Sequence, residues 1–196
     1  MNKLKHWIRT ASGLPIDPLA PTPDAIEIGD IAHALSHQCR FAGHVAVFYS
    51  VAQHCVHVAT LLRDRGYPRR VQLAGLLHDA SEAYLTDIPT PIKVRLPEYK
   101  AAEDRLQAVI MEKFGLAFEH GNEAVHRAIK AADLTMLAME ARDLHGDPQD
   151  WESLTGVKRE RWTVHAISPT VAREQFRARF EFLSRLADSE PANEGT

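Results

Sequence analysis

The chain has 196 residues and a formal net charge of −3, and its composition is 45% hydrophobic and 25% charged. These values are ordinary for a single globular domain and give no reason to expect a nucleic-acid or membrane surface. We expect no membrane-spanning segment and no secretory signal, because no apolar run is long enough and the N-terminus lacks an apolar core. Two cysteines do not make a disulfide framework, so we expect a cytoplasmic protein with reduced thiols.

The beginning of the chain is rich in proline and is expected to form an arm that packs on the domain. Four prolines prevent a long helix there, namely Pro15, Pro18, Pro21 and Pro23. Asp30 is a candidate N-cap for the first long helix. We therefore divide the chain into an arm at 1–29, one helical domain at 30–187 and a disordered tail at 188–196.

The middle of the chain predicts two helices and a stiff loop. Ser50 is a suitable N-cap for a helix over residues 51–65, in which apolar residues recur at helical spacing. A glycine and a proline separate it from a second helix over 69–85. Two prolines then stiffen a loop at 87–93.

The second half of the chain predicts three further helices. They span about 98–114, 123–144 and 169–187, and the segment 145–168 between the last two reads as a loop. We find no repeat and no convincing run of strands. The sequence therefore predicts an all-α bundle.

The adjacent pair His78-Asp79, followed by Glu82, lies in an otherwise apolar stretch of the predicted 69–85 helix. Burying such groups without partners is costly, and no basic residue nearby compensates them. A divalent metal ion is the simplest partner, because neutral imidazole and carboxylate together suit Mn, Fe, Co, Ni or Zn. Glu82 follows His78 by four residues, so on a continuous helix the two share a face.

Two more residues extend this hypothesis to other helices. Asp133 sits among alanines and leucines, and it is either an exposed or capping aspartate or a carboxylate that closes a metal site. His54 lies in the first turn of its predicted helix and is either a partly buried histidine with ordinary partners or a further ligand. His57, three residues later, is a rival ligand on a neighbouring face.

The order of these residues resembles the HD phosphohydrolase superfamily, whose pattern is a His, a later His-Asp pair and a distant Asp on helices. The resemblance is closer to the bacterial 5′-deoxynucleotidases of that superfamily. Residues 78–82 read His-Asp-Ala-Ser-Glu and residues 86–93 read Thr-Asp-Ile-Pro-Thr-Pro-Ile-Lys, as in that group. The match covers roughly residues 40–140.

The resemblance implies one HD domain in which four residues bind a single divalent ion, Mn, Co, Fe, Ni, Zn or Mg. These ligands are His54, His78, Asp79 and Asp133. Glu82 matches the family's catalytic glutamate, and Asp79 belongs to the catalytic set as well as to the ligands. The implied activity is hydrolysis of a (deoxy)nucleoside 5′-monophosphate, by attack of metal-bound water on phosphorus.

The resemblance also suggests substrate contacts. Arg40 lies near the place of a phosphate-binding arginine, and its planar fork suits a phosphate dianion. His44 either donates to the phosphate or is a loop histidine. Asp87 matches an aspartate that accepts a sugar hydroxyl, and Lys93 either steers anions or faces water. Residues 15–48 depart from the nucleotidase pattern, so the identity of the substrate does not transfer with the motifs.

Several alternatives stay open. The substrate could be a nucleoside triphosphate or a cyclic dinucleotide, or the protein could be a non-catalytic nucleotide-binding sensor, against which the presence of Glu82 argues. His120 and His126 lie where two-metal HD phosphodiesterases add ligands, but they lack the adjacent-His arrangement of those enzymes. The expected partner is a small nucleotide, with no nucleic acid and no membrane, and a homodimer is an option because related nucleotidases are dimeric.

Overall fold

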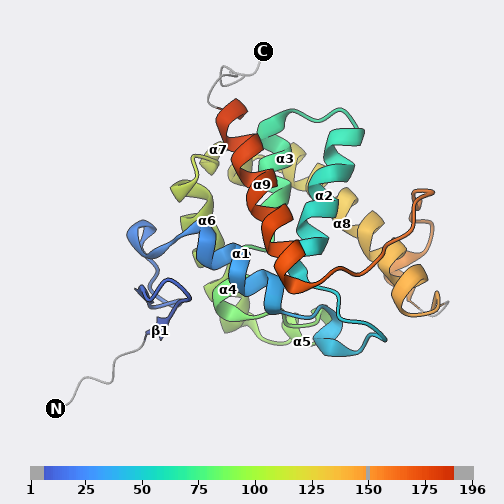
Figure 1. The fold of residues 1–196 in the computed structure, drawn as a ribbon, viewed down its shortest axis with the longest axis horizontal. Coiled ribbons are helices and arrows are strands. Elements are labelled where there is room, and N and C mark those ends of the chain that lie inside the picture. Colours follow the sequence, from blue (N-terminus) through green and yellow to red (C-terminus); the bar gives the residue numbers. More distant parts are fainter. Residues whose placement is uncertain (1–6, 149–150, 188–196) are drawn as a thin grey trace.

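The computed structural model describes residues 7–148 and 151–187, which form a helical bundle (Figure 1). The elements in chain order are β1 (Ile8–Arg9), β2 (Pro15–Ile16), α1 (Ile28–His37), α2 (Val51–Asp64), α3 (Arg69–Leu76), α4 (Glu82–Leu85), α5 (Thr90–Lys93), α6 (Pro97–Lys113), α7 (Ala117–Gly121), α8 (Glu123–Leu144) and α9 (Pro169–Ala187). The predicted all-α fold is confirmed, with one small antiparallel hairpin, β1–β2, added to it. The predicted tail at 188–196 lies outside the described residues.

The core forms where α2, α3 and α9 pack against one another, with α1 and α8 beside them (Figure 1). Apolar side chains from distant parts of the chain meet there and are fully or almost fully buried, among them Leu35, Cys55, Leu73, Leu106 and Phe176. Ile16 and Ile26, which precede α1, are also buried in this core. Burial of apolar surface is the main stabilising term for such a bundle.

The long helices match the sequence patterns that predict them. The side chain of Ser50 accepts a hydrogen bond from the backbone N–H of Gln53 at 3.2 Å, so the predicted N-cap of α2 is confirmed. Helices α8 and α9 have the predicted bounds, and α6 lies one residue before its prediction. Amphipathic periodicity over many turns was sufficient to locate these elements.

The predicted continuous helix over 69–85 is wrong, because α3 ends at Leu76 and α4 begins only at Glu82. The side chain of Gln107, from α6, inserts into the backbone between them. Its Nε2 donates to the carbonyl of Leu77 at 2.7 Å, and its Oε1 accepts from the N–H of Ser81 at 3.0 Å. These two groups would pair with each other in a continuous helix, so the insertion opens a turn at 77–81.

Two smaller expectations also differ from the structure. Asp30 is not an N-cap, since α1 begins at Ile28. Its carboxylate instead accepts hydrogen bonds from the backbone N–H of Ser12 at 2.7 Å and from the Ser12 hydroxyl at 2.8 Å, which ties the N-terminal segment to α1. The predicted loop at 87–93 ends in the short helix α5, because proline is well tolerated in a first helical turn.

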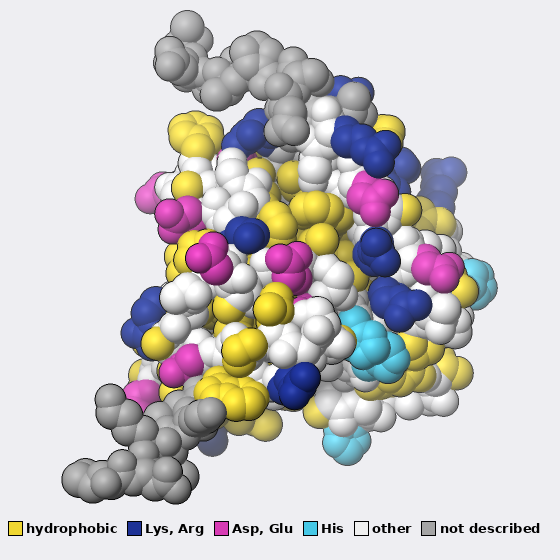
Figure 2. All heavy atoms as spheres, turned by 60° about the vertical axis from the view of Figure 1, so that its left-hand side comes forward, with side chains coloured by type: hydrophobic (Ala, Val, Ile, Leu, Met, Phe, Trp, Pro, Cys, Tyr) yellow, Lys and Arg dark blue, Asp and Glu magenta, His cyan; other side chains and the backbone are white. Residues whose placement is uncertain are grey.

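One face of the surface mixes the two signs of charge. Figure 2 shows basic and acidic side chains interspersed with apolar ones on that face, without a continuous patch of either sign. Among the residues that the structure describes, no helix is both long and apolar enough to cross a membrane.

Candidate metal centre

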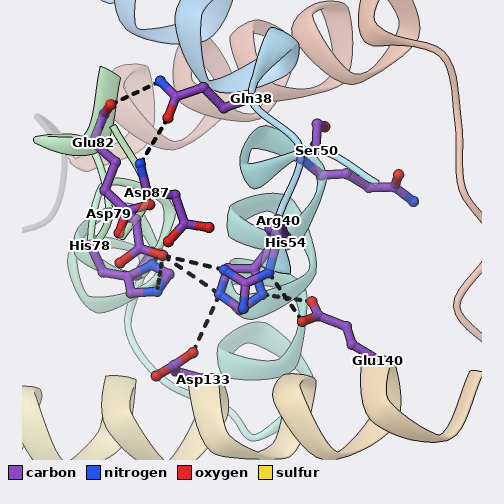
Figure 3. Close-up of polar contacts among 12 residues, drawn as sticks. Gln38, Arg40, Ser50, His54, His78, Asp79, Glu82, Asp87, Asp133 and Glu140 are labelled. Carbon is purple, nitrogen blue, oxygen red and sulfur yellow. Dashed lines mark hydrogen bonds and ion pairs between the residues drawn. The ribbon is translucent and has the colours of Figure 1, made fainter. Parts of the chain in front are cut away.

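The four residues predicted as metal ligands converge on one point between α2, the 77–81 turn and α8 (Figure 3). Nε2 of His54 lies 3.3 Å from Oδ1 of Asp133 and 3.8 Å from Oδ2 of Asp79. Nε2 of His78 lies 3.2 Å from the same Asp79 oxygen. One ligand atom from each of His54, His78 and Asp133 lies within 4.8 Å of the other two, which is close enough to share an ion.

Both imidazole rings direct Nε2 towards this point because Nδ1 is already engaged. Nδ1 of His54 donates to Oε1 of Glu140 at 2.7 Å, and Nδ1 of His78 donates to the carbonyl of Gly75 at 2.8 Å. Both Nε2 atoms are buried, and within the described part of the chain neither has a hydrogen-bond partner. Metal-binding histidines are held in this way, with the second ring nitrogen on a carboxylate or a backbone carbonyl.

The charges around these atoms favour a cation. Burial and the charge of Arg40 oppose protonation of His54, but the carboxylates of Glu140 and Asp133 outweigh them and raise its pKa to about 9. Although burial opposes ionisation of Asp133, His54 and His78 hold its pKa well below the usual range. The site therefore presents imidazole and carboxylate groups, a combination that could hold a divalent metal ion.

Arg40 lies beside the cluster, as predicted. Its Nε donates to Oε2 of Glu140 at 3.1 Å, and its Nη1 lies 3.8 Å from Oδ2 of Asp79. The charges of Glu140 and Asp79 overcome desolvation and raise the pKa of this guanidinium further. The Phe41 ring lies over it, with Cζ of Arg40 5.3 Å from the ring centroid.

Glu140, which is fully buried on α8, is not among the site residues predicted from the sequence. Burial opposes ionisation of this carboxyl, but Arg40 and His54 lower its pKa to about 2. A signal was present in the sequence: Glu140 follows Asp133 by seven residues, so both lie on one face of α8. A lone carboxylate between Met139 and Ala141 is unusual unless it is paired.

Glu82 begins α4 and is also buried, three residues after the predicted ligand pair His78-Asp79. Its Oε1 lies 3.2 Å from Nζ of Lys93, whereas Oε2 is buried and has no hydrogen-bond partner among the described residues. Burial, and then the charges of Asp79 and Asp87, raise the pKa of Glu82 well above its usual value. A carboxyl group of this kind can hold a proton near neutral pH.

Gln38, at the end of α1, fixes the position of the Glu82 segment, a role that no pattern in the sequence indicates. Its Nε2 donates to the backbone carbonyl of Glu82 at 2.8 Å (Figure 3). Its Oε1 accepts from the backbone N–H of Asp87 at 3.0 Å. Thr86, between these residues, has a positive φ of 69°, which is uncommon for a β-branched residue. The segment is therefore held in a strained conformation by a side chain from another helix.

The predicted substrate contacts differ in their surroundings. Nζ of Lys93 contacts two carboxylates, Glu82 at 3.2 Å and Glu103 at 2.6 Å, so its charge is already compensated. Asp87 is half-buried, and burial raises its pKa although the nearby charge of Arg40 lowers it. His44 is exposed, and among the described contacts none joins its side chain to the ligand residues.

The rival histidines lie elsewhere. Nδ1 of His57 is 3.0 Å from the hydroxyl of Tyr49, and its ring packs edge-on against Trp162. The rings of His120 and His126 lie 5.6 Å apart, and within the described residues neither belongs to a metal-sized group of ligand atoms. The structure therefore places His54, and not His57, beside His78 and Asp133, and within the described part of the chain no cluster of ligand atoms forms around His120.

A cavity of about 250 Å³ opens beside the predicted ligand residues. His78, Asp79 and Asp133 form one wall of it, and side chains from α5 to α8 form the others, including Lys93. Small-molecule sites are concave in this way, with a few polar groups that fix the orientation of the ligand.

One known protein is similar to this chain over almost its whole length. The chain is 42% identical over 182 residues to the uncharacterized protein YfdR of Escherichia coli K12, covering 92% of this chain and 97% of YfdR. The chain belongs to the YfdR family. It is also 41% identical over 147 residues to the uncharacterized protein RCAP_rcc00048 of Rhodobacter capsulatus, which covers 72% of the chain and 74% of that protein. No family model matches the chain.

This YfdR-family chain is also similar to proteins with a named activity, but over a shorter stretch. It is 37% identical over 71 residues to the 5′-deoxynucleotidase PBPRA2627 of Photobacterium profundum, and 35% identical over 71 residues to a 5′-deoxynucleotidase of Vibrio atlanticus. Each match covers 30% of this chain and 37% of the relative. The similarity to the nucleotidases is therefore partial.

Proposed function

We propose that this protein is a metal-dependent phosphohydrolase of the HD type that hydrolyses a (deoxy)nucleoside 5′-monophosphate. The observation that carries the proposal is the pair of buried Nε2 atoms of His54 and His78, which make no hydrogen bond among the described residues and face the carboxylates of Asp79 and Asp133. The partial similarity to two proteins named 5′-deoxynucleotidase supports the choice of substrate class.

The donor set fits a divalent cation. Two imidazole nitrogens and two carboxylates suit Mn, Co, Fe, Ni, Zn or Mg to different degrees, and availability selects among them. In this proposal His54, His78, Asp79 and Asp133 hold the ion. When bound, such an ion lowers the pKa of water and polarises a phosphoryl oxygen.

Arg40 binds the phosphate in this proposal. Glu140 occupies its Nε, and Nη1 lies 3.8 Å from Oδ2 of Asp79, so in this proposal the Nη groups contact an anion bound beside Asp79. A guanidinium donates two parallel hydrogen bonds to phosphate and cannot lose its charge. It therefore holds the substrate and compensates negative charge that develops on the phosphoryl oxygens.

Glu82 transfers the proton. Burial and the charges of Asp79 and Asp87 raise its pKa well above the usual value, and its buried Oε2 is not engaged by another described group. We assign to this oxygen the donation of a proton to the leaving sugar oxygen, a role that contributes roughly 10²- to 10⁴-fold to a rate. Lys93 then acts through Glu82, by holding its other oxygen at 3.2 Å, instead of contacting the substrate as predicted.

Asp87 and His44 complete the proposed substrate site. Asp87 is positioned by Gln38 and is half-buried near the ligand residues, so we assign it the sugar hydroxyl. His44 is exposed on the loop that follows Arg40, from which it would reach a bound phosphate only if that loop moved.

Release of phosphate tests the proposal. Metal-stripped protein is given Mn²⁺, Co²⁺, Mg²⁺ or Zn²⁺ with a panel of nucleoside mono-, di- and triphosphates. We expect metal-dependent release from monophosphates, reduced roughly 10²-fold or more in Glu82→Gln, with Mn²⁺ binding retained. Exposed Glu174 on α9 gives the matched control, Glu174→Gln, which should keep the wild-type rate. Metal binding without release from any monophosphate would refute the proposal.

A further inference from the structure

Glu140 is a carboxylate with no exposure to solvent, and both of its oxygens are used. Oε1 accepts from Nδ1 of His54 at 2.7 Å, and Oε2 accepts from Nε of Arg40 at 3.1 Å (Figure 3). One side chain therefore joins a proposed metal ligand to the proposed phosphate-binding residue. It is also outside the set of residues that the motifs identify.

Stability alone is a poor explanation for this carboxylate. An ionised carboxylate taken out of water loses its hydration, and a well-packed apolar side chain of similar volume often stabilises a core equally well or better. Glu140 lies among apolar neighbours on α8, with Met139 and Ala141 both buried. The two hydrogen bonds that it accepts point instead to a role in orienting His54 and Arg40.

The effect on His54 follows from the chemistry of imidazole. A carboxylate can only accept, so His54 must carry a proton on Nδ1. In the neutral ring the lone pair then lies on Nε2, which faces Asp79 and Asp133. Glu140 thereby fixes the tautomer that can bind a metal.

The effect on Arg40 is geometric. Its backbone N–H donates to the carbonyl of Tyr49 at 2.9 Å, which fixes the backbone at the base of a loop. The next two residues, Phe41 and Ala42, have positive φ values of 58° and 51°, so the chain turns away sharply under strain. The hydrogen bond from Nε to Glu140 then fixes the plane of the guanidinium and directs Nη1 towards Asp79.

We propose that Glu140 is a positioning residue that couples the metal ligand His54 to the phosphate-binding Arg40. This inference rests on the proposed function. A single change at Glu140 should weaken metal binding and raise KM for the phosphate substrate together, whereas an ordinary core residue would change only the free energy of unfolding.

Glu140→Gln is the discriminating variant, because an amide has one accepting and one donating end. If the amide oxygen faces His54, its NH₂ faces the N–H of Arg40 and repels it. If the amide is reversed, His54 must accept at Nδ1 and carries its proton on Nε2, where the metal would bind. Either orientation satisfies one partner at the expense of the other. Loss of a group that orients a metal ligand commonly costs 10- to 100-fold in affinity.

The experiment measures Mn²⁺ affinity by calorimetry, and KM and kcat for a nucleoside monophosphate, in wild type and Glu140→Gln. We expect affinity to fall and KM to rise, with at least a roughly tenfold change in one and a smaller change in the other. Asp143→Asn is the control, since Asp143 lies on α8 one turn later and accepts from the Val164 N–H at 2.7 Å. That variant should lose stability but keep wild-type Mn²⁺ affinity and KM.

The outcomes separate the two proposals. Wild type that releases phosphate, with unchanged Mn²⁺ affinity and KM in Glu140→Gln, overturns the role of Glu140 and leaves the function standing. Wild type that binds Mn²⁺ more tightly than Glu140→Gln, but releases no phosphate, refutes the function and supports the metal half of the inference. If the variant does not fold, ¹⁵N NMR of Zn²⁺-loaded wild type gives the answer. A slowly exchanging proton on Nδ1 of His54 supports the inference, and its absence overturns it.

Discussion

His54 and His78 present the same ring nitrogen to the same point, but they are held by different kinds of partner. His54 is fully buried on α2, and its Nδ1 bonds to the side chain of Glu140 at 2.7 Å. His78 is partly exposed in a turn between helices, and its Nδ1 bonds to the backbone carbonyl of Gly75 at 2.8 Å. A helix positions the Nε2 atom of His54 and a turn positions that of His78, yet both atoms face the same point.

This difference determines which substitutions should disturb the orientation of each histidine ring. A side-chain partner can be removed by one substitution, and its removal leaves a charge buried. A backbone carbonyl is present whatever the residue, so the orientation of His78 depends on the turn that places it. The first arrangement is therefore sensitive to a change on α8, and the second to a change on α6, from which Gln107 holds the turn open.

The largest expected effect comes from removing each ring. His54→Ala and His78→Ala should both lower Mn²⁺ affinity by about 100-fold or more, since each removes a proposed ligand. Only His54→Ala should also destabilise the fold strongly, by roughly 3–5 kcal/mol, because it breaks a fully buried charge pair with Glu140. Urea unfolding and calorimetry measure the two quantities. Equal losses of stability in the two variants would show that the buried pair of His54 with Glu140 contributes no more to stability than the contacts of His78.

The next effect is the pH dependence of stability that arises from His57, which lies on α2 three residues after His54. The hydroxyl of Tyr49 lies 3.0 Å from Nδ1 of His57. Burial lowers the pKa of His57 from 6.5 to about 4 in the folded protein. Between these values the unfolded chain binds a proton that the folded chain does not, so the free energy of unfolding falls as pH falls. The loss should reach roughly 3 kcal/mol by pH 4, and nothing should be lost above 6.5.

His57→Gln provides the check on this pH effect. The variant should unfold with a flatter pH dependence between pH 6.5 and 4 than wild type, measured by urea titration of metal-free protein at several pH values. A variant with the same slope as wild type would place the pH sensitivity on other groups.

The smallest of these effects should come from a change at Gln107, which holds the 77–81 turn that contains His78. Gln107→Leu keeps the volume near that of the wild type but leaves the Leu77 carbonyl and the Ser81 N–H without their partner. The expected loss of stability is about 1–3 kcal/mol, accompanied by weaker Mn²⁺ binding as His78 and Asp79 shift. Chemical denaturation and calorimetry again measure both. An unchanged Mn²⁺ affinity would indicate that the turn holds its shape without Gln107.

The sequence predicted the long helices well, because their periodic apolar faces and a local N-cap at Ser50 are properties of the segment itself. It failed at 77–81 for the opposite reason. Nothing between Leu76 and Glu82 is a helix breaker, and the break is made by Gln107, a residue more than two dozen positions later. Such a contact is visible only once α6 lies beside the 77–81 turn.

The site divides in a similar way. The resemblance to the HD superfamily implies the four proposed ligands, and the structure brings these four residues together, while their roles stay predictions. Glu140 was within reach of the sequence, because it lies two helical turns after Asp133 on one face. Gln38 was not, since a glutamine at the end of α1 carries no signal for its bonds to Glu82 and Asp87. The resemblance alone places Lys93 among the substrate contacts, and its two carboxylate partners, which come from other elements, are visible only in the structure.

The loop that begins at Arg40 has a consequence for how this protein can vary. Its two ends are closed by hydrogen bonds from the Arg40 N–H to the Tyr49 carbonyl at 2.9 Å and from the Val51 N–H to the Gln38 carbonyl at 3.1 Å. Its tip, by contrast, exposes His44, Val47 and Phe48. Replacing or lengthening that tip would leave the core and the ring of proposed ligands intact. A bundle built this way can change its surface at a few positions without altering the buried interior that holds the predicted ligands.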